Sequence, residues 1–339
     1  MKDTFMKAFG FNSNEAQPLL IEKNTPQATG HDLLVKIDAI AVNPVDTKVI
    51  ASIKEPLVEP KIVGWDVSGT VTQVGELVDL FKLGDKVFYA GDVSRPGCYA
   101  SHQLVDERIV GHAPKSLSAA ESAAMPLTSI TAWEALFSRL KIIADLDKGK
   151  NILIIGGAGG VGSIAIQLAK TVAQLNVITT ASRNESEQWC YKLGADHVLN
   201  HHSDLIVQYL TLGIDDPDYI LCLNNTDRHF EAMAELIAPQ GMICSIVGTQ
   251  EKHDLDCLKS KSAGFVWEFM FTRPMFKTSD MLTQHHLLNK VSQLLDDGQL
   301  SSTLTSTVGP INADNIVKAH QQLLSGSTIG KVALTAIAN

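Results

Sequence analysis

The chain has 339 residues, of which 45% are hydrophobic and 19% charged, so it is long enough for two domains with substantial cores, and this composition excludes extensive disorder. Its net charge of −9 argues against nucleic-acid binding, which needs a basic surface. The five cysteines are scattered and form no C-x-x-C pair, and the sequence shows no apolar signal core. No apolar run approaches the roughly 20 residues that span a bilayer. These features predict a cytoplasmic protein without a membrane partner.

The first 120 residues are predicted to form a loop-rich β domain. Strand-like segments lie at Leu33–Ile37, Val67–Val74 and Lys86–Tyr89, and a Gly84-Asp85 turn precedes the last of them. Proline and glycine residues recur between these segments, which is typical of short strands joined by turns.

From about residue 122 the pattern changes to alternating strands and helices. A helical segment at 129–140 precedes a compact apolar run, Asn151–Ile155. The strands and helices predicted after it occupy residues 177–180, 189–193, 197–199, 219–223, 229–237 and 242–247. Such alternation predicts an α/β domain with a parallel, doubly wound sheet. A helix at 280–296 and a strand at 331–334 close the chain.

A glycine-rich turn follows the apolar run and opens a helical pattern. Its residues are Gly157, Ala158, Gly159, Gly160, Val161 and Gly162. In this strand–turn–helix context, the first glycine permits a tight turn, the second lets the backbone approach a pyrophosphate, and the third lets the helix pack against the strand. The helix N-terminus then favours the anion. The motif predicts a dinucleotide site; the alternative is a plain turn without a ligand.

The residues after the second strand of this domain indicate which dinucleotide binds. An acidic residue there would bind the ribose 2′-hydroxyl of NAD, but the chain has Ser182 and Arg183 instead. A guanidinium forms charge-assisted hydrogen bonds with a 2′-phosphate, so NADP(H) is favoured. The alternatives are a solvated surface arginine, or a Glu185 that pairs with Arg183 or binds a ribose itself.

Short motifs along the whole chain resemble those of the medium-chain dehydrogenase/reductase superfamily, within it the zinc-independent quinone oxidoreductase-like branch, whose members are often labelled zinc-type alcohol dehydrogenase-like. Besides the glycine turn, the motifs are Val42–Asp46, Gly64–Gly69, Leu83–Val87, Pro126–Trp133, Thr180–Arg183, Leu193–His197, Trp267–Arg273 and Ile329–Val332. The resemblance implies a GroES-like, β-rich catalytic domain at 1–121, completed by 276–339. It also implies an inserted Rossmann domain at 122–275 and an active site between the two domains.

The zinc ligands of alcohol dehydrogenases have no counterparts in these motifs. Where those enzymes carry a ligand cysteine and a ligand histidine, this sequence has Asn43 and Trp65, and the segment Pro126–Trp133 lacks the third ligand, a cysteine. The four-cysteine structural zinc loop is missing too, because only Cys98 lies in that region. We therefore expect no metal in this protein.

The resemblance also implies roles for single residues. Asn43 and Lys48 are the candidate catalytic residues, and Trp65 and Phe271 the candidate walls of a substrate pocket. Beyond the glycine turn, Ser182 and Arg183, the implied cofactor-binding residues are Asn43, Thr131, His201, Val247, Gly248, Phe271 and Lys331. The alternatives are a turn asparagine at position 43, a solvated Lys48, and ordinary core packing of the two aromatic residues.

These observations predict an NADPH-dependent oxidoreductase that transfers hydride to a quinone or an α,β-unsaturated carbonyl without zinc. Such acceptors take a hydride without a metal Lewis acid. Either Lys48 or water would deliver the proton. The alternatives are a zinc-dependent alcohol dehydrogenase and a non-catalytic NADPH-binding sensor. The resemblance further implies a homodimer formed through an edge strand, for which Gly264–Trp267 is the candidate.

Overall fold

The computed structural model describes residues 5–14 and 17–338, and the chain divides into two compact units. Unit 1 holds the residues up to Ile130 together with those from Phe271 onward, and unit 2 is Thr131–Met270. The sequence placed the breaks after residues 121 and 275. The two units divide after Ile130, within helix α3 (Pro126–Trp133), which follows the short helix α2 (Ala119–Ala123), and after Met270.

Unit 1 is built on two sheets whose strands mostly run antiparallel. The seven-stranded sheet has the order β15-β16-β3-β5-β6-β8, with β7 paired to β3, and a three-stranded sheet has the order β2-β1-β4. The predicted strands at 67–74 and 86–89 are confirmed without change. The strands of unit 1 are β1 (Phe5–Phe11), β2 (Leu19–Asn24), β3 (Asp32–Ala41), β4 (Lys61–Ile62), β5 (Val67–Val74), β6 (Lys86–Tyr89), β7 (His102–Asp106), β8 (Val110–His112), β15 (Leu304–Pro310) and β16 (Lys331–Thr335).

Helices complete unit 1. They are α1 (Pro44–Ala51), the short 3₁₀ helix η1 (Glu107–Ile109), α2, the start of α3, α9 (Thr272–Phe276), α10 (Thr283–Asp296) and α11 (Ala313–Leu324). The predicted helix at 280–296 is confirmed as α10, which buries Leu287, Leu288 and Val291 at helical spacing and packs on β8. Sequence periodicity missed α1, because eight residues opened by a proline give too few turns for a clear pattern.

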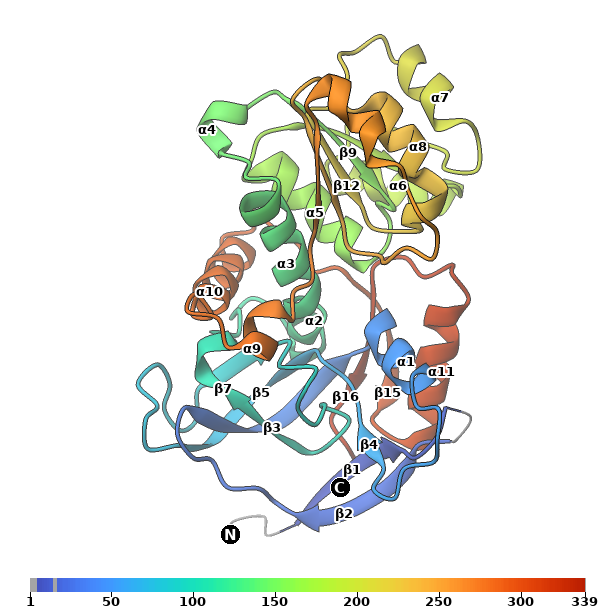
Figure 1. Ribbon diagram of the computed structural model, residues 1–339. Coiled ribbons are helices and arrows are strands. Elements are labelled where there is room, and N and C mark those ends of the chain that lie inside the picture. The colour runs from blue at the N-terminus through green and yellow to red at the C-terminus, as the bar shows by residue number, and fades with distance from the viewer. Residues whose placement is uncertain (1–4, 15–16, 339) are drawn as a thin grey trace. The chain divides into compact units, whose positions relative to one another are not determined.

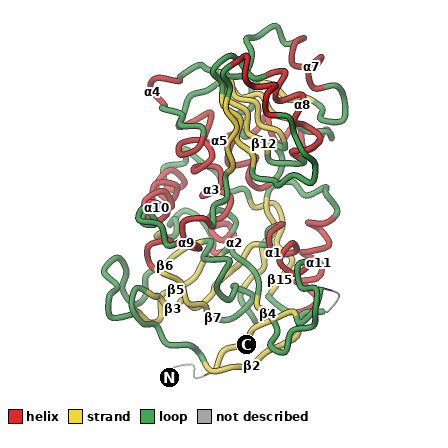
Figure 2. Tube along the Cα trace, viewed as in Figure 1, coloured by secondary structure: helices red, strands yellow, loops and turns green. Residues whose placement is uncertain are grey.

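Unit 2 is a parallel sheet with helices on both faces (Figure 1). Its strand order is β11-β10-β9-β12-β13-β14, and each neighbouring pair is parallel, which confirms the predicted doubly wound fold. Figure 2 shows these strands as a central layer flanked by helices. The elements are η2 (Glu134–Arg139), α4 (Ala144–Asp147), β9 (Asn151–Ile155), α5 (Gly160–Thr171), β10 (Asn176–Thr180), α6 (Asn184–Lys192), β11 (His197–Leu199), α7 (Leu205–Thr211), β12 (Tyr219–Cys222), α8 (Thr226–Leu236), β13 (Met242–Ser245), η3 (Leu255–Lys261) and β14 (Gly264–Trp267).

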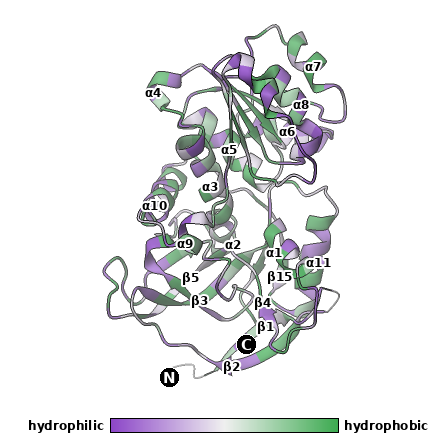
Figure 3. Cartoon of the chain, in the orientation of Figure 1, coloured by the Kyte–Doolittle hydropathy of each residue, from purple (hydrophilic) through white to green (hydrophobic). Residues whose placement is uncertain are grey.

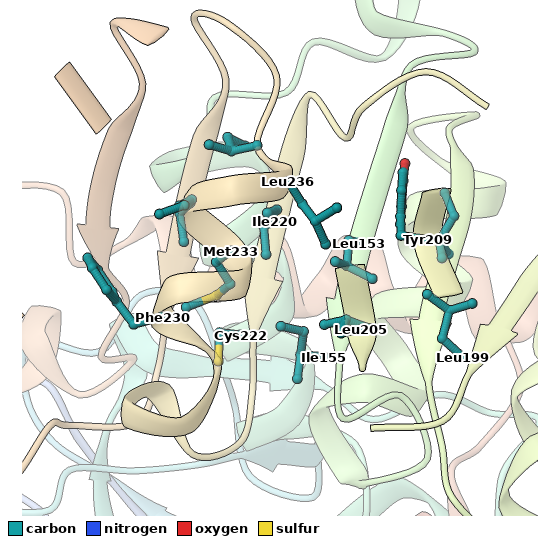
Figure 4. Packing of buried hydrophobic residues seen from close by; sticks show 14 of the residues in the cluster. Leu153, Ile155, Leu199, Leu205, Tyr209, Ile220, Cys222, Phe230, Met233 and Leu236 are labelled. Carbon is teal, nitrogen blue, oxygen red and sulfur yellow. The ribbon is translucent and has the colours of Figure 1, made fainter. Parts of the chain in front are cut away.

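The core of unit 2 is apolar because its central strands are covered on both faces. All five residues of β9 are buried, and Figure 3 shows the sheet strands as mostly hydrophobic. From α8, Phe230, Met233 and Leu236 pack into a cluster with Leu153 of β9 and Ile220 of β12 (Figure 4). Within the described ranges, no helix combines the length and the apolar character needed to cross a bilayer.

Candidate functional site

The glycine turn lies at the carboxyl end of β9, where the strand order of unit 2 reverses. Ile155 of β9 pairs with Cys222 of β12, so the two strands end level. The left-handed residue of the turn is Gly156, with φ of 94°, rather than Gly157, to which the motif assigned the tight turn. Gly157 is needed for a different reason: a Cβ there would lie 2.0 Å from Oγ1 of Thr179 in β10. The sequence therefore missed Gly156, which lies immediately before the motif.

Two other glycines of the turn differ in their surroundings: Gly162 is tightly packed, whereas Gly159 has open space beside it. A Cβ at Gly162 would lie 2.3 Å from the Gly156 carbonyl oxygen, so the third glycine does allow α5 to pack against the strand end. A Cβ at Gly159 would have that same oxygen as its nearest neighbour, 3.8 Å away. Gly159 is also the N-cap of α5, without a side-chain cap and without an acidic residue in the first turn. The turn therefore fits a pyrophosphate group.

Polar and basic residues follow strands β10, β11 and β12, which end at the same edge of the sheet. Ser182 and Arg183 come after β10, and the exposed Arg183 is the N-cap of α6. His201 comes after β11, and its carbonyl oxygen accepts a hydrogen bond of 2.9 Å from Nη2 of Arg228 in the first turn of α8. Arg228 is not among the residues predicted from the sequence. Its position three residues after the N-cap Asn225, beyond the fourth strand, was the signal that could have identified it.

Arg183 and Arg228 form one positively charged region around His201. Burial lowers the pKa of His201, and the charges of His202, Arg228 and Arg183 lower it further. Both guanidinium groups are therefore close enough to the imidazole to disfavour its protonation. Such a region is suited to an anion with two or more oxygen atoms, such as a phosphate monoester.

The remaining candidates of unit 2 lie at separate positions in the chain. Thr131 is buried on α3, at the start of the unit. Strand β13 ends at Ser245, so Val247 and Gly248 lie in the loop beyond it rather than at the strand end that the sequence predicted. The Val247 carbonyl accepts a hydrogen bond from the Thr226 hydroxyl, and a Cβ at Gly248 would meet nothing within 4 Å.

Unit 1 brings Asn43 and Lys331 into direct contact in a buried polar network. Lys331 Nζ donates to Oδ1 of Asn43 and to the Val42 carbonyl at 2.8 Å, and forms an ion pair with Asp66 at 3.0 Å. Asn43 Nδ2 donates to the same Asp66 oxygen at 2.9 Å, while the other Asp66 oxygen accepts from Leu127 N at 2.8 Å. The side chains of Asn43, Asp66 and Lys331 are all buried. These contacts use the three donors of the Lys331 ammonium, so the geometry favours a role other than binding cofactor phosphate.

A second buried network fixes the start of α1. Asp46 Oδ2 accepts from Asn43 N at 2.9 Å and from the Tyr99 hydroxyl at 3.0 Å, and that hydroxyl lies 2.7 Å from Nε2 of His320. Burial raises the pKa of Asp46 to about 7, against the lowering effect of these hydrogen bonds and of Lys331. Burial also lowers the pKa of His320 to about 4. Asp46 therefore organises the loop around Asn43.

The aromatic candidates of unit 1 also lie together, whereas Lys48 lies apart from them. Trp65 and Phe271 are buried and meet edge to face, with ring centroids 6.2 Å apart. Trp65 Nε1 donates to the Asp92 carbonyl at 3.1 Å, which orients the indole. Lys48 is exposed on α1.

The residues at the positions of the zinc ligands do not fit zinc. Asn43 presents its amide oxygen to an ammonium group, and the indole of Trp65 offers no lone pair to a metal. The neighbouring carboxylate, Asp66, already accepts hydrogen bonds on both oxygens and pairs with Lys331. In the described part of the chain, no three His, Cys, Asp or Glu residues are grouped so that they could hold a metal ion. A zinc site needs three such ligands.

An unpredicted pair of buried carboxyl groups lies in unit 2, at the junction of η2 and the end of β14. Arg139 Nε donates to Oε2 of Glu268 at 2.7 Å, and both Glu134 and Glu268 are buried. Burial raises the pKa of Glu268, and the nearby negative charge of Glu134 raises it further. The Arg139 guanidinium thus faces two carboxyl groups, and Glu268 keeps its proton to a higher pH than an ordinary glutamate.

Replacing Glu134 with glutamine should make stability less sensitive to rising pH. Because the pKa of Glu268 is raised above 4.5 in the folded state, the folded protein holds a proton that the unfolded chain releases, and stability falls as the pH rises from that value. In Glu134→Gln, the loss of unfolding free energy between about pH 5 and about pH 8 should shrink by about 1.4 kcal/mol for each unit by which the Glu268 pKa falls.

Urea unfolding at the two pH values measures this difference. Glu231→Gln is the control, because Glu231 is exposed on α8 in the same unit. An unchanged pH dependence in Glu134→Gln would show that Glu134 does not set the protonation of Glu268.

Comparison with known proteins assigns the family. Residues 29–127 match the model of the alcohol dehydrogenase GroES-like domain, and residues 193–334 match that of zinc-binding dehydrogenases. A zinc-type alcohol dehydrogenase-like protein of Staphylococcus aureus is 46% identical, over 92% of this chain and 93% of its own. The tomato (Solanum lycopersicum) 2-methylene-furan-3-one reductase is 30% identical over 97% of this chain and 79% of its own.

A solved structure shows the same fold over the full length. A protein from Rhizobium etli, provisionally named a zinc-dependent alcohol dehydrogenase, is 47% identical and covers 99% of both chains with a TM-score of 0.94. Together with the parallel six-stranded sheet of unit 2 and the β-rich unit 1, these similarities settle the family. The chain belongs to the medium-chain dehydrogenase/reductase superfamily of oxidoreductases, in the group of zinc-type alcohol dehydrogenase-like proteins.

Proposed function

We propose that this protein is an NADPH-dependent oxidoreductase that reduces a quinone or an α,β-unsaturated carbonyl without zinc. The tomato relative is by name a reductase of a methylene-furanone, which is an α,β-unsaturated ketone. The positive region around Arg183 and Arg228 supports NADPH over NADH, because a 2′-phosphate is the group that distinguishes the two.

The observation that carries the proposal is the ion pair between Lys331 and Asp66, together with its hydrogen bonds to Asn43. An ammonium group held against these side chains repels a second cation and occupies their lone pairs. Without a metal Lewis acid, an unactivated alcohol or ketone is a poor partner for hydride transfer. Quinones and enones accept hydride at carbon while their oxygen atom is stabilised by hydrogen bonds alone.

The roles in this reaction are assigned residue by residue. The bound nicotinamide cofactor supplies the hydride. The backbone from Gly159 to Gly162 holds the pyrophosphate, and Arg183 with Arg228 holds the 2′-phosphate. Trp65 and Phe271 provide apolar surface for a planar acceptor and exclude water.

On the acceptor side of the reaction, Asn43 offers an amide N–H to the acceptor oxygen. Lys48 or water delivers the proton that completes the reduction.

An acceptor screen tests the proposal. Purified protein should consume NADPH in the presence of quinones or enones, followed by NADPH absorbance, and should turn over NADH more slowly. No turnover with any member of a broad panel would refute the reductase assignment, and tight NADPH binding with no turnover would favour a sensor. Stoichiometric zinc by elemental analysis would refute the zinc-free site.

We further propose a homodimer formed through β14. This strand is the last in the sheet order of unit 2, and it carries the exposed Trp267, with exposed Phe269 just beyond it. Trp267→Asp should halve the mass measured by light scattering after size-exclusion chromatography. Leu210→Asp, which changes another exposed apolar residue, on α7, should leave the mass unchanged. A wild-type protein with the mass of one chain would refute the dimer.

A further inference from the structure

We propose that Lys331 positions and polarises the side-chain amide of Asn43, so that one Asn43 N–H becomes a strong, oriented donor to the oxygen of the reduced acceptor. This inference rests on the proposed function for its consequence in catalysis. Its structural part concerns residues of unit 1 alone.

The side chain of Lys331 is held in one place. It lies on β16, is 3% exposed, and directs its ammonium group to the Val42 carbonyl, to Asn43 Oδ1 and to Asp66 Oδ2. Asp66 is 0% exposed and compensates the charge. A buried ammonium without such a partner would carry a large desolvation cost. Lys331 and Asp66 therefore form a neutral ion pair.

The ion pair of Lys331 and Asp66 fixes the orientation of the Asn43 amide. Its oxygen accepts from Lys331, and one hydrogen of Nδ2 is donated to Asp66 at 2.9 Å. A rotation of the amide by half a turn would place its NH₂ group against the ammonium and its oxygen against the carboxylate. The position of charges therefore selects one of the two amide orientations.

One of the two N–H groups of the Asn43 amide makes only a weak hydrogen bond. The second contact of Asn43 Nδ2 is to the Ala41 carbonyl at 3.5 Å, the outer limit of a hydrogen bond. A cation on the amide oxygen withdraws electron density from nitrogen and strengthens the remaining N–H as a donor, an effect of roughly 10–30% for each bond in a chain. Because Asn43 is buried, this donor acts in a medium of low dielectric constant.

The combination of Lys331 and Asn43 thus does through an amide what a metal does by direct coordination. The charge is separated from the acceptor oxygen by the Asn43 amide and two hydrogen bonds, and no metal ligand is required. This assignment replaces the expectation that Lys331 binds the cofactor.

The test uses a double variant, Lys331→Met with Asp66→Asn, which removes both charges and leaves no buried ion uncompensated. The side-chain carbonyl of an asparagine at position 66 still accepts a hydrogen bond. We expect the kcat for the preferred acceptor to fall roughly 10- to 100-fold, with the NADPH dissociation constant changed less than about twofold. Lys318→Met, the same change at an exposed position of α11, should leave both values unchanged.

Asn43→Ala provides the coupling measurement. In that background the double change should cost less than about twofold in kcat, because the amide through which Lys331 acts is gone. Equal losses with and without Asn43 would overturn the proposal. A large loss of NADPH affinity in the double variant would also overturn it, since it would make Lys331 a cofactor ligand.

A second readout does not depend on turnover. In protein labelled with ¹⁵N-asparagine, the Asn43 side-chain signal is identified by its loss in Asn43→Ala, and the double variant should shift it. If the wild-type protein reduces no acceptor, the proposed function fails while this shift still supports the positioning of Asn43. An unmoved signal overturns the inference whether or not the enzyme is active.

Discussion

Replacing Gly159 with alanine should abolish tight NADPH binding while leaving the protein folded. Gly159 has φ of −72°, which alanine adopts freely, and a Cβ there would approach only the Gly156 carbonyl, at 3.8 Å. The unfolding free energy should therefore change by no more than about 0.5 kcal/mol. The methyl group would project from the N-cap of α5, where a pyrophosphate must approach the backbone, so the NADPH dissociation constant should rise at least about tenfold.

Gly162→Ala is the matched comparison. Its Cβ would lie 2.3 Å from the Gly156 carbonyl oxygen and 2.5 Å from that of Gly157, so the backbone of the turn must move. We expect this variant to lose about 3 kcal/mol of stability as well as NADPH binding. Urea unfolding and titration calorimetry separate the two effects. Wild-type affinity in Gly159→Ala would show that no phosphate rests on this turn.

Arg183→Ala and Arg228→Ala should each weaken NADPH binding and leave NADH binding within about twofold of the wild type. A hydrogen bond to a charged group contributes roughly 1.5–3 kcal/mol, so each loss corresponds to about 10- to 150-fold in the dissociation constant. Because both guanidinium groups influence His201, we expect them to act on the same phosphate.

Lys259→Ala is the control for this pair, because it removes an exposed positive charge from η3 in the same unit. Equal weakening of NADPH and NADH binding in Arg183→Ala would contradict the 2′-phosphate assignment. If Arg183→Ala weakened NADPH binding and Arg228→Ala did not, Arg228 would not belong to the 2′-phosphate site. Arg183, which was predicted from the sequence, would then be the one arginine of the pair that binds the phosphate.

The parallel sheet could be predicted because its signals are local. Buried strands such as Asn151–Ile155 read as short apolar runs, and the helices between them repeat apolar residues every three to four positions. The glycine turn is equally local, since strand, turn and helix are consecutive. Even there, the left-handed position proved to be Gly156 rather than Gly157, because the sequence does not show which of two adjacent glycines has the positive φ angle.

Unit 1 was harder to predict because its strands are short and its partners are remote. The two-residue β4 and the irregularly paired β15 are defined by neighbours that lie far away in the sequence. No pattern within these segments specifies which strand they will pair with.

The sequence by itself determined the family, the glycine turn and the presence of Asn43 and Trp65 in their motifs, because each of these signals consists of neighbouring residues. Only the tertiary structure decided which side chains surround Asn43. Lys331 lies 288 positions from Asn43, and β16 must pair with β3 before its ammonium reaches that amide and Asp66. The same is true of Arg228, which reaches His201 only because parallel strands end at one edge of the sheet. Electrostatic contacts depend on distance in space, and chain separation carries no information about them.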